Sequence, residues 1–196
     1  QAAIAEPVNA SYHVPTPEVS APYIAEMARA EMVGRYGSEA YTEGFRVTTT
    51  VPSDLQELAN TAVHEGLIAY DQRHGYRGPE SRLPGKTLAV WTQELAKQRP
   101  ISGLEPAIVT QVDKDGIQVL TRTGEAHVSW NTMKWARKFL NTNSMGPMPK
   151  QPSDVAQVGD LIRVQPQADG SYKFSQVPTV QGALVSLDPD NGAIRA

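Results

Sequence analysis

The chain has 196 residues, of which 40% are apolar and 20% charged, and its formal net charge is −3. No apolar run reaches the roughly 18 residues that a bilayer-spanning helix needs, and no segment has the strongly basic balance of a nucleic-acid module. The chain contains no cysteine, which excludes disulfides and thiolate metal sites but leaves the compartment open.

The start of the sequence predicts a connector followed by a helix. Residues 1–19 contain three prolines and little periodicity, which favours an extended connector with a short helix at its start. Because the first residues contain neither an initiator methionine nor a signal-peptide pattern, we expect them to come from the interior of a longer polypeptide. A helix is then expected from about Ala21 to Tyr36, capped by Ser20 and stopped by Gly37. Its apolar residues recur at helical spacing: Ile24, Met27, Ala28 and Met32.

A β-branched run from Phe45 to Val51 predicts a strand that ends at Pro52. Ser53 and Gln56 have the spacing of a capping box, in which each side chain bonds the other residue's backbone N–H group. A long amphipathic helix is therefore expected to begin at Ser53 and to run to about Arg73.

The next predicted elements are a loop over 74–86 and a shorter helix over Thr87–Gln98. Short runs of strand-forming residues separated by Gly-containing turns then predict a three-stranded meander, formed by Ala107–Val112, Ile117–Arg122 and Glu125–Ser129. A short helix over Asn131–Leu140 and a long loop over Asn141–Ala156 are expected to follow.

Two further strands are predicted at Leu161–Gln165 and Ser171–Gln176. Five short strands with a helix between the third and the fourth are typical of a small Greek-key barrel of the OB type. The chain is expected to close on a hairpin whose first strand is Gln181–Leu187 and whose turn is Asp188–Gly192.

Metal chemistry finds little support in the sequence. The four histidines do not have the spacing of metal ligands, and His64-Glu65 lacks a second histidine one helical turn later. Two Asp- and Gly-containing segments, Asp113–Gly116 and Asp188–Gly192, resemble calcium loops but lack the closing glutamate, so both are interpreted as hairpin turns. No metal or cofactor site is expected.

Aromatic and basic residues interleave on the predicted helix after the third barrel strand. They are Trp130, Lys134, Trp135, Arg137 and Lys138. The favoured interpretation packs Trp135 and Phe139 against the barrel and leaves the cations in solvent. A surface that contacts a protein or a glycan, and a site for single-stranded nucleic acid, are the alternatives, and the low net charge disfavours the latter.

Three stretches resemble the class A penicillin-binding proteins, which are bifunctional peptidoglycan synthases, and most closely those of the 1A type from Gram-negative bacteria. They are Ala21-Pro22-Tyr23 through Arg35-Tyr36-Gly37, Phe45–Thr50 with Leu55-Gln56, and Gln181–Pro189 with Gly192-Ala193-Ile194; His74–Pro79 lies between them. The resemblance covers nearly the whole chain.

The resemblance implies an α+β fragment in four parts. A glycosyltransferase end with a helical linker (1–43) and a strand-helix part of the transpeptidase domain (44–104) precede an OB-like insertion (105–179) and the first transpeptidase hairpin (180–196). Because the opening strand and this hairpin flank the insertion, we expect Arg46–Thr50 to lie near Ala183–Leu187. The resemblance also implies a periplasmic location, in a parent anchored in the inner membrane.

The transpeptidase motifs of this family are missing from the sequence. There is no Ser-x-x-Lys and no Lys-Thr-Gly, and the triplet Ser129-Trp130-Asn131 matches Ser-x-Asn without its partners. We therefore predict no catalytic residue and a linker and docking role. Its partners would be the flanking catalytic domains, the peptidoglycan synthesis machinery and an outer-membrane lipoprotein activator. The alternative is a free-standing OB module that binds oligosaccharide or single-stranded nucleic acid.

Overall fold

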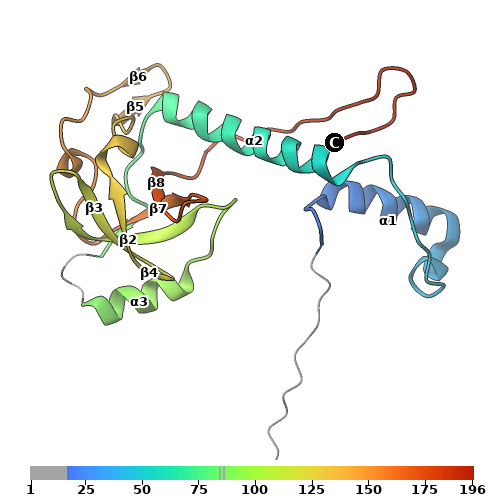
Figure 1. Ribbon diagram of the computed structural model, residues 1–196, viewed down its shortest axis with the longest axis horizontal. Helices are drawn as coiled ribbons and strands as arrows, with labels where there is room; N and C mark the ends of the chain where they lie inside the picture. Colours follow the sequence, from blue (N-terminus) through green and yellow to red (C-terminus); the bar gives the residue numbers. More distant parts are fainter. Residues whose placement is uncertain (1–16, 84, 86) are drawn as a thin grey trace, which may run out of the picture. The chain divides into compact units, whose positions relative to one another are not determined.

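The computed structural model describes residues 17–83, 85 and 87–196 (Figure 1). Most of the predicted N-terminal connector therefore lies outside the described residues. The chain divides into two compact units, one of which holds the residues up to Thr61 together with Leu184–Ala196 and the other Ala62–Ala183. The long helix α2 (Ser53–His74) begins in the first unit and ends in the second.

The first unit contains α1 (Pro22–Tyr36) and the 3₁₀ turn η2 (Gly37–Tyr41), which confirms the first predicted helix. Its expected cap was wrong, because Ala21 occupies the N-cap position and makes no side-chain cap. Ser20 instead accepts a 2.9 Å hydrogen bond through its carbonyl oxygen from the Asn60 side chain. In the part of the chain that the structure describes, α1 buries none of its residues.

Helix α2 begins where the sequence predicts, but the expected capping box does not form. The Ser53 hydroxyl donates to the Glu18 carboxylate at 2.7 Å, and the Gln56 side chain donates to Asn60 Oδ1 at 3.0 Å. The Asp54 carboxylate accepts from the Leu55 N–H at 2.9 Å. The Gln56 N–H, which the box would have bonded to the serine oxygen, donates to the Pro52 carbonyl at 3.1 Å instead.

The strand predicted at Phe45–Val51 was wrong. Residues 45–50 are exposed, and the segment pairs with no strand among residues 17–83, 85 and 87–196. A β-branched run favours a pleated backbone, but a strand also needs a neighbour to bond its N–H and C=O groups.

The closing turn at Asp188–Gly192 is confirmed by a bond from the Asp188 N–H to the Ala193 carbonyl and by a bridge between Leu187 and Ile194. The strand expected over Gln181–Leu187 is not formed beyond that bridge. The Thr50 hydroxyl donates to the Ile194 carbonyl at 2.7 Å, so the end of the Arg46–Thr50 segment does contact the closing turn structure.

The second unit is built on a closed five-stranded barrel, which confirms the predicted OB-like architecture and the α+β class (Figure 1). Its strands close in the order β7-β2-β3-β4-β8-β7, with β4 and β8 parallel and the other pairs antiparallel. They are β2 (Glu105–Val112), β3 (Gly116–Thr121), β4 (Gly124–Ser129), β7 (Asp160–Pro166) and β8 (Tyr172–Ser175). The predicted meander is β2-β3-β4.

Alternating apolar residues of the strands fill the barrel, and those with almost no exposed area include Val109, Ile117, Val119, Val128, Val164 and Phe174. Helix α3 (Leu88–Lys97), which confirms the second predicted helix, packs Trp91 and Leu95 on the outside of the barrel against Ile108, Leu120 and Leu161. The two-residue strand β1 (Ser81–Arg82) adds to the edge of β7.

The helix predicted over Asn131–Leu140 was wrong. The chain forms the single 3₁₀ turn η3 (Trp130–Thr132), further turns, and the hairpin β5 (Phe139–Asn141) with β6 (Ser144–Met145). Tyr76 explains the difference, because its N–H donates to the Arg137 carbonyl at 2.7 Å and its carbonyl accepts from the Phe139 N–H at 2.8 Å. These bonds occupy backbone groups that a helix would have used.

The predicted loop Asn141–Ala156 is partly ordered by β6 and by a second 3₁₀ turn, η4 (Pro152–Asp154). The connection between β4 and β7 therefore carries two 3₁₀ turns and a small hairpin, whereas the sequence predicted a helix between the third and fourth barrel strands.

The parallel contact between β4 and β8 is short, with Val128 opposite Tyr172 as its single register pair. Thr132 reinforces it. The Thr132 hydroxyl donates to the Ser129 carbonyl at 2.8 Å and accepts from the Phe174 N–H at 3.2 Å. One side chain thus ties the end of β4 to β8.

Gly116 begins β3 where the chain passes very close to β4. A Cβ on this residue would overlap the carbonyl oxygen of Val128, so Gly116→Ala should lower the free energy of unfolding by at least about 2 kcal/mol. Gly124→Ala is the control, since its φ is +133° but nothing lies within 4 Å of the added methyl group. Gly124→Ala should lower the free energy of unfolding by about 1 kcal/mol, and urea unfolding measures both variants. Equal losses in the two variants would contradict the overlap with Val128.

Candidate functional site

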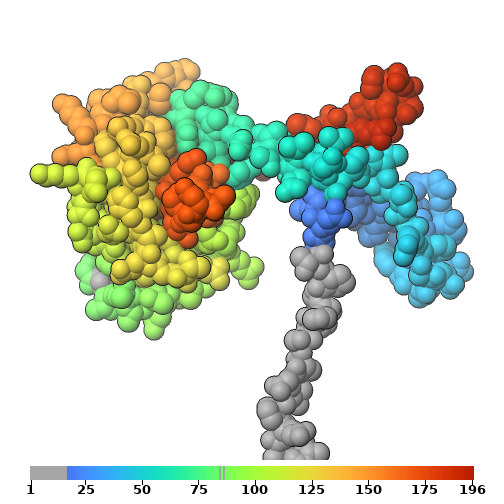
Figure 2. Space-filling model, in the orientation of Figure 1, coloured from blue at the N-terminus to red at the C-terminus, as the bar shows by residue number. Residues whose placement is uncertain are grey.

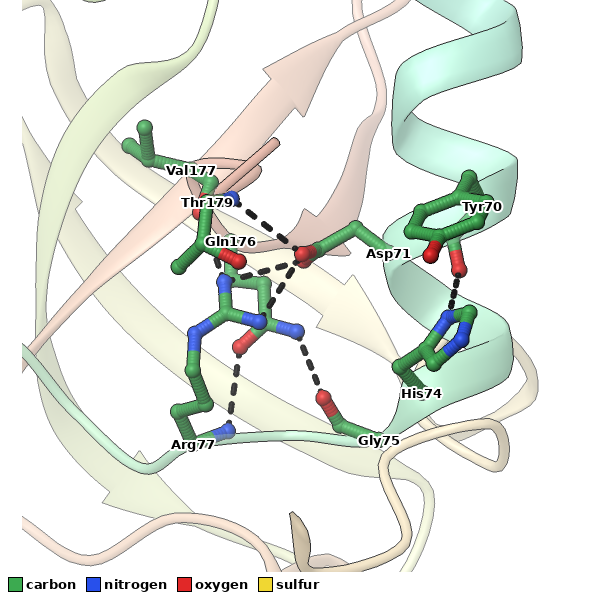
Figure 3. A network of polar contacts seen from close by, with 8 residues as sticks. All are labelled: Tyr70, Asp71, His74, Gly75, Arg77, Gln176, Val177 and Thr179. Carbon is green, nitrogen blue, oxygen red and sulfur yellow. Dashed lines mark hydrogen bonds and ion pairs between the residues drawn. The ribbon is translucent and has the colours of Figure 1, made fainter. Parts of the chain in front are cut away.

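The candidate site is the junction at which the end of α2 meets the barrel (Figure 3). Helix α2 ends at His74, and Gly75 follows with φ +96°, a left-handed conformation that suits a glycine after a helix. A Cβ on Gly75 would lie 2.8 Å from the Arg137 carbonyl oxygen, so the backbone approaches the barrel more closely there than a side chain would allow.

A polar cluster, here called the junction network, consists of the side chains of Asp71, Arg77 and Gln176. Arg77 forms two parallel bonds to the Asp71 carboxylate, from Nη1 at 2.8 Å and from Nη2 at 3.0 Å. The Asp71 side chain is 3% exposed and that of Arg77 28% exposed. Forked pairing of this kind is the strongest geometry for a guanidinium and a carboxylate.

The network also reaches the segment that follows β8 (Figure 3). Arg77 Nη2 donates to the Val177 carbonyl at 2.7 Å, and the Thr179 N–H donates to Asp71 at 3.3 Å. The buried Gln176 amide donates to the Gly75 carbonyl at 2.8 Å and accepts from the Arg77 N–H at 3.1 Å. The beginning and the end of the barrel unit are therefore fastened to the same helix end.

Tyr76 lies between these polar groups and the barrel core. Its ring packs edge-on against Phe174, with centroids 5.1 Å apart, and against Trp135 at 6.2 Å. Burial, with a smaller contribution from Asp160, raises the pKa of the Tyr76 hydroxyl above its ordinary range.

Two further ion pairs connect the chain after Tyr76 to β7. Arg163 donates to both carboxylate oxygens of Glu80, at 2.8 and 2.9 Å, and Arg82 lies 3.1 Å from Asp160. Arg163 and Asp160 are almost completely buried, so each would be costly to leave without its partner. Residues 80–82 are thus held along β7 by charge as well as by backbone bonds.

The residues singled out in the sequence lie after β4 but do not form one helical face. Trp130 and Trp135 are half-buried against the barrel core, and Arg137 donates to the Gly146 carbonyl at 2.8 Å. Lys134 and Lys138 are exposed, and Lys134 donates to Asn131 Oδ1. Figure 2 shows this segment, coloured yellow to orange, on the surface of the barrel unit.

The junction network is suited to holding elements together, because its carboxylate and guanidinium are saturated by each other and by backbone groups. Among the residues that the structure describes, no cluster of three or more His, Asp or Glu is placed to bind a metal ion. None of the described helices has the length and apolar character needed to cross a membrane.

Comparison with known protein families shows which family this barrel belongs to. The family described as "Penicillin-binding protein OB-like domain" matches residues 76–180, more than half of the 196 residues. The chain belongs to this family. The match begins at Tyr76, so it covers β1 and α3 as well as the barrel strands.

Curated relatives are similar over the whole chain. "Penicillin-binding protein 1A" of Pseudomonas aeruginosa is 68% identical and that of Vibrio cholerae 43% identical, each over 100% of this chain. The crystal structure of Penicillin-Binding Protein 1A from Haemophilus influenzae matches 99% of this chain and 28% of its own, with 36% identity and a TM-score of 0.75. The resemblance to the 1A type is confirmed, and the chain spans about a quarter of its curated relatives.

The sequence predicted the three residues of the junction network in separate elements, with Asp71 in the long helix, Arg77 in the loop over 74–86 and Gln176 at the end of a strand. One sequence feature indicated a junction at this point. Tyr76 and Arg77 directly follow a glycine at the end of a long helix, and further charged residues follow at Glu80 and Arg82. Their partners lie far along the chain, since Arg77 and Gln176 are 99 residues apart.

Proposed function

We propose that this chain is the non-catalytic linker and OB-like docking region of a bifunctional peptidoglycan synthase with glycosyltransferase and transpeptidase domains. Its parent is anchored in the inner membrane, acts in cell-wall synthesis in the periplasm, and is a target of β-lactams. The proposed parts are the glycosyltransferase end and linker (1–43), the strand-helix part of the transpeptidase domain with its connector (44–104), the OB-like insertion (105–179) and the transpeptidase hairpin (180–196). The connector from Tyr76 onward is matched by the same family model as the barrel.

The observation that carries this proposal is the barrel fastened to the end of α2 by the junction network. The saturated ion pairs favour a supporting role, since they leave no activated nucleophile or base at the junction. The names of the relatives support a penicillin-binding parent, and the absence of Ser-x-x-Lys from the sequence supports placing its serine nucleophile elsewhere.

For the docking role, we propose the surface formed by Trp130, Lys134, Trp135, Arg137 and Lys138, with an outer-membrane lipoprotein as the partner. Between Glu125 and Asp154 the sequence contains no acidic residue, although the whole chain has a net charge of −3. The exposed amines of Lys134 and Lys138 would contact carboxylates of the partner. Trp130 and Trp135 pack against the barrel core beside them.

The test immobilises the 196-residue chain and measures binding of individually purified periplasmic lipoproteins from the same bacterium by biolayer interferometry. We expect one of them to bind with a Kd of about 10 µM or lower, and Lys134→Glu with Lys138→Glu to weaken it about tenfold. Lys114→Glu, which reverses an exposed charge in the β2–β3 turn, is the matched control and should leave binding unchanged. The docking role fails if no lipoprotein binds at about 100 µM.

A further inference from the structure

An exposed methionine lies on a restricted stretch of backbone shortly after the β5–β6 hairpin of the barrel unit. Met148 is 57% exposed, and prolines at positions 147 and 149 flank it. A proline fixes its own φ and restricts the residue before it to extended conformations, so the backbone at Met148 has few alternatives. Little backbone freedom would therefore be lost if a partner covered this side chain.

The stretch Gly146–Lys150, here called the methionine segment, is fastened to the barrel unit at both ends. The Gly146 N–H donates to the Lys138 carbonyl at 2.7 Å. At the other end, the Lys150 N–H donates to the Asp154 carboxylate at 2.7 Å. The exposed methionine is the middle residue of this segment, so its position on the surface is set from both sides.

Two exposed lysines, Lys138 and Lys150, lie at the two ends of the methionine segment. Lys138 packs beside Gly146, because a Cβ added to Gly146 would lie 3.3 Å from the Cβ of Lys138. Met148 is two residues from each end of the segment, and two residues of extended chain cover about 7 Å. An exposed apolar side chain thus lies between two cationic residues.

The charges of these two lysines are not neutralised by neighbouring carboxylates. Neither Lys138 nor Lys150 forms an ion pair within residues 17–83, 85 and 87–196. The Asp154 carboxylate, which follows the segment, accepts from the backbone N–H groups of Lys150 and Gln151, at 2.7 and 3.2 Å. The lysines can therefore attract carboxylates of a partner, and a basic partner would be repelled.

We propose that Met148 is the apolar anchor of the docking surface, and that Lys138 and Lys150 select a protein segment whose apolar side chains are flanked by carboxylates. This inference rests on the proposed docking role and extends its surface from Trp130–Lys138 to the methionine segment. Methionine suits an anchor position, because its flexible thioether adapts to the shape of an apolar partner and is common in the centre of interfaces.

The test labels the methyl groups of the five methionines in the 196-residue chain with ¹³C and follows them by NMR. The probe is an acetylated peptide of two leucines flanked on each side by two aspartates. We expect a saturable shift of the Met148 signal with a Kd of about 1 mM or lower. Replacing the aspartates by lysines, or the leucines by serines, should weaken binding at least fivefold. Broadening of the Met148 signal by phosphatidylglycerol vesicles, without a shift by the peptide, would assign the segment to a lipid surface and overturn the proposal.

Met27 is the internal control in the same spectrum. Its side chain is 56% exposed, nearly as much as that of Met148, but it follows the acidic Glu26 and belongs to the first unit. Its signal should not move with the acidic peptide, and neither should that of the fully buried Met133. Equal shifts of Met27 and Met148 would show that the probe reports apolar exposure alone, and the proposed anchor would be wrong.

The variant Met148→Ser connects the anchor to the docking assay described above. It should weaken the binding lipoprotein about tenfold, whereas Val158→Ser, which truncates a side chain that is 51% exposed in the same unit, should leave binding unchanged. Normal lipoprotein binding by Met148→Ser would overturn the anchor and leave the docking role intact. A saturable Met148 shift with the acidic peptide, combined with no lipoprotein binding, would instead remove the lipoprotein as partner and support the preference for acidic segments.

Discussion

Arg77→Met is expected to lower the free energy of unfolding of the barrel unit by about 3 kcal/mol. Methionine keeps the apolar stem but removes the guanidinium that bonds both Asp71 oxygens and the Val177 carbonyl. Asp71, which is 3% exposed, would keep only its weak bond from the Thr179 N–H. A buried carboxylate without its cation is strongly destabilising, so the loss should exceed that of an ordinary surface ion pair.

Urea unfolding followed by tryptophan fluorescence measures this effect, because the three tryptophans, at positions 91, 130 and 135, all lie in the barrel unit. Arg73→Met removes an exposed cation from the same helix and should change stability by less than about 0.5 kcal/mol. Asp71→Asn combined with Arg77→Met should recover part of the loss, since no unpaired charge remains. A loss below about 1 kcal/mol for Arg77→Met would show that the junction network does not hold the helix end.

Phe174→Ala is expected to lower the free energy of unfolding of the barrel unit by about 4 kcal/mol. The ring is 1% exposed and contacts Tyr76 and Trp135 at centroid distances of 5.1 and 5.8 Å. Its removal would leave a cavity where β8, the junction and the segment after β4 meet, and close packing there prevents the neighbours from filling it.

Thermal unfolding and urea unfolding, each followed by tryptophan fluorescence, should both report the loss for Phe174→Ala. Phe45→Ala is the matched control, since Phe45 is 44% exposed and belongs to the first unit. It should leave the tryptophan-detected transition unchanged. Similar losses for the two variants would mean that the transition does not report the barrel core.

Local patterns predicted the barrel strands because each strand carries its own signal. Alternating apolar residues in β2 and β3 fill the core, and the turn at Asp113–Gly116 separates them at a length that fits a hairpin. The helices α2 and α3 were predicted for the same reason, because apolar residues recur at helical spacing within each segment.

The errors arise where a distant partner decides the structure. The spacing of Trp135 and Phe139 suits a helix, but the backbone of Tyr76 takes the bonds of Arg137 and Phe139. Likewise, the Ser53 hydroxyl bonds Glu18 and not the helix backbone. No local pattern contains these distant partners.

The candidate site was less predictable than the fold for the same reason. Arg77 and Asp71 are close in the sequence, but the burial that makes their pairing strong comes from Gln176, Val177 and Thr179 about a hundred residues later. The resemblance to a known family identified the OB-like region in the sequence. The contacts of the junction network are visible only in the structure.

The short β4–β8 contact gives the barrel an uneven resistance to opening. Every other strand pair is supported by several register positions, whereas this seam has Val128 opposite Tyr172 and the bonds of one threonine hydroxyl. Local unfolding begins where the fewest contacts hold the structure. The β4–β8 pair should therefore open locally before the barrel unfolds as a whole. The Thr132 hydroxyl, which bonds the end of β4 and β8, should therefore make this opening less frequent.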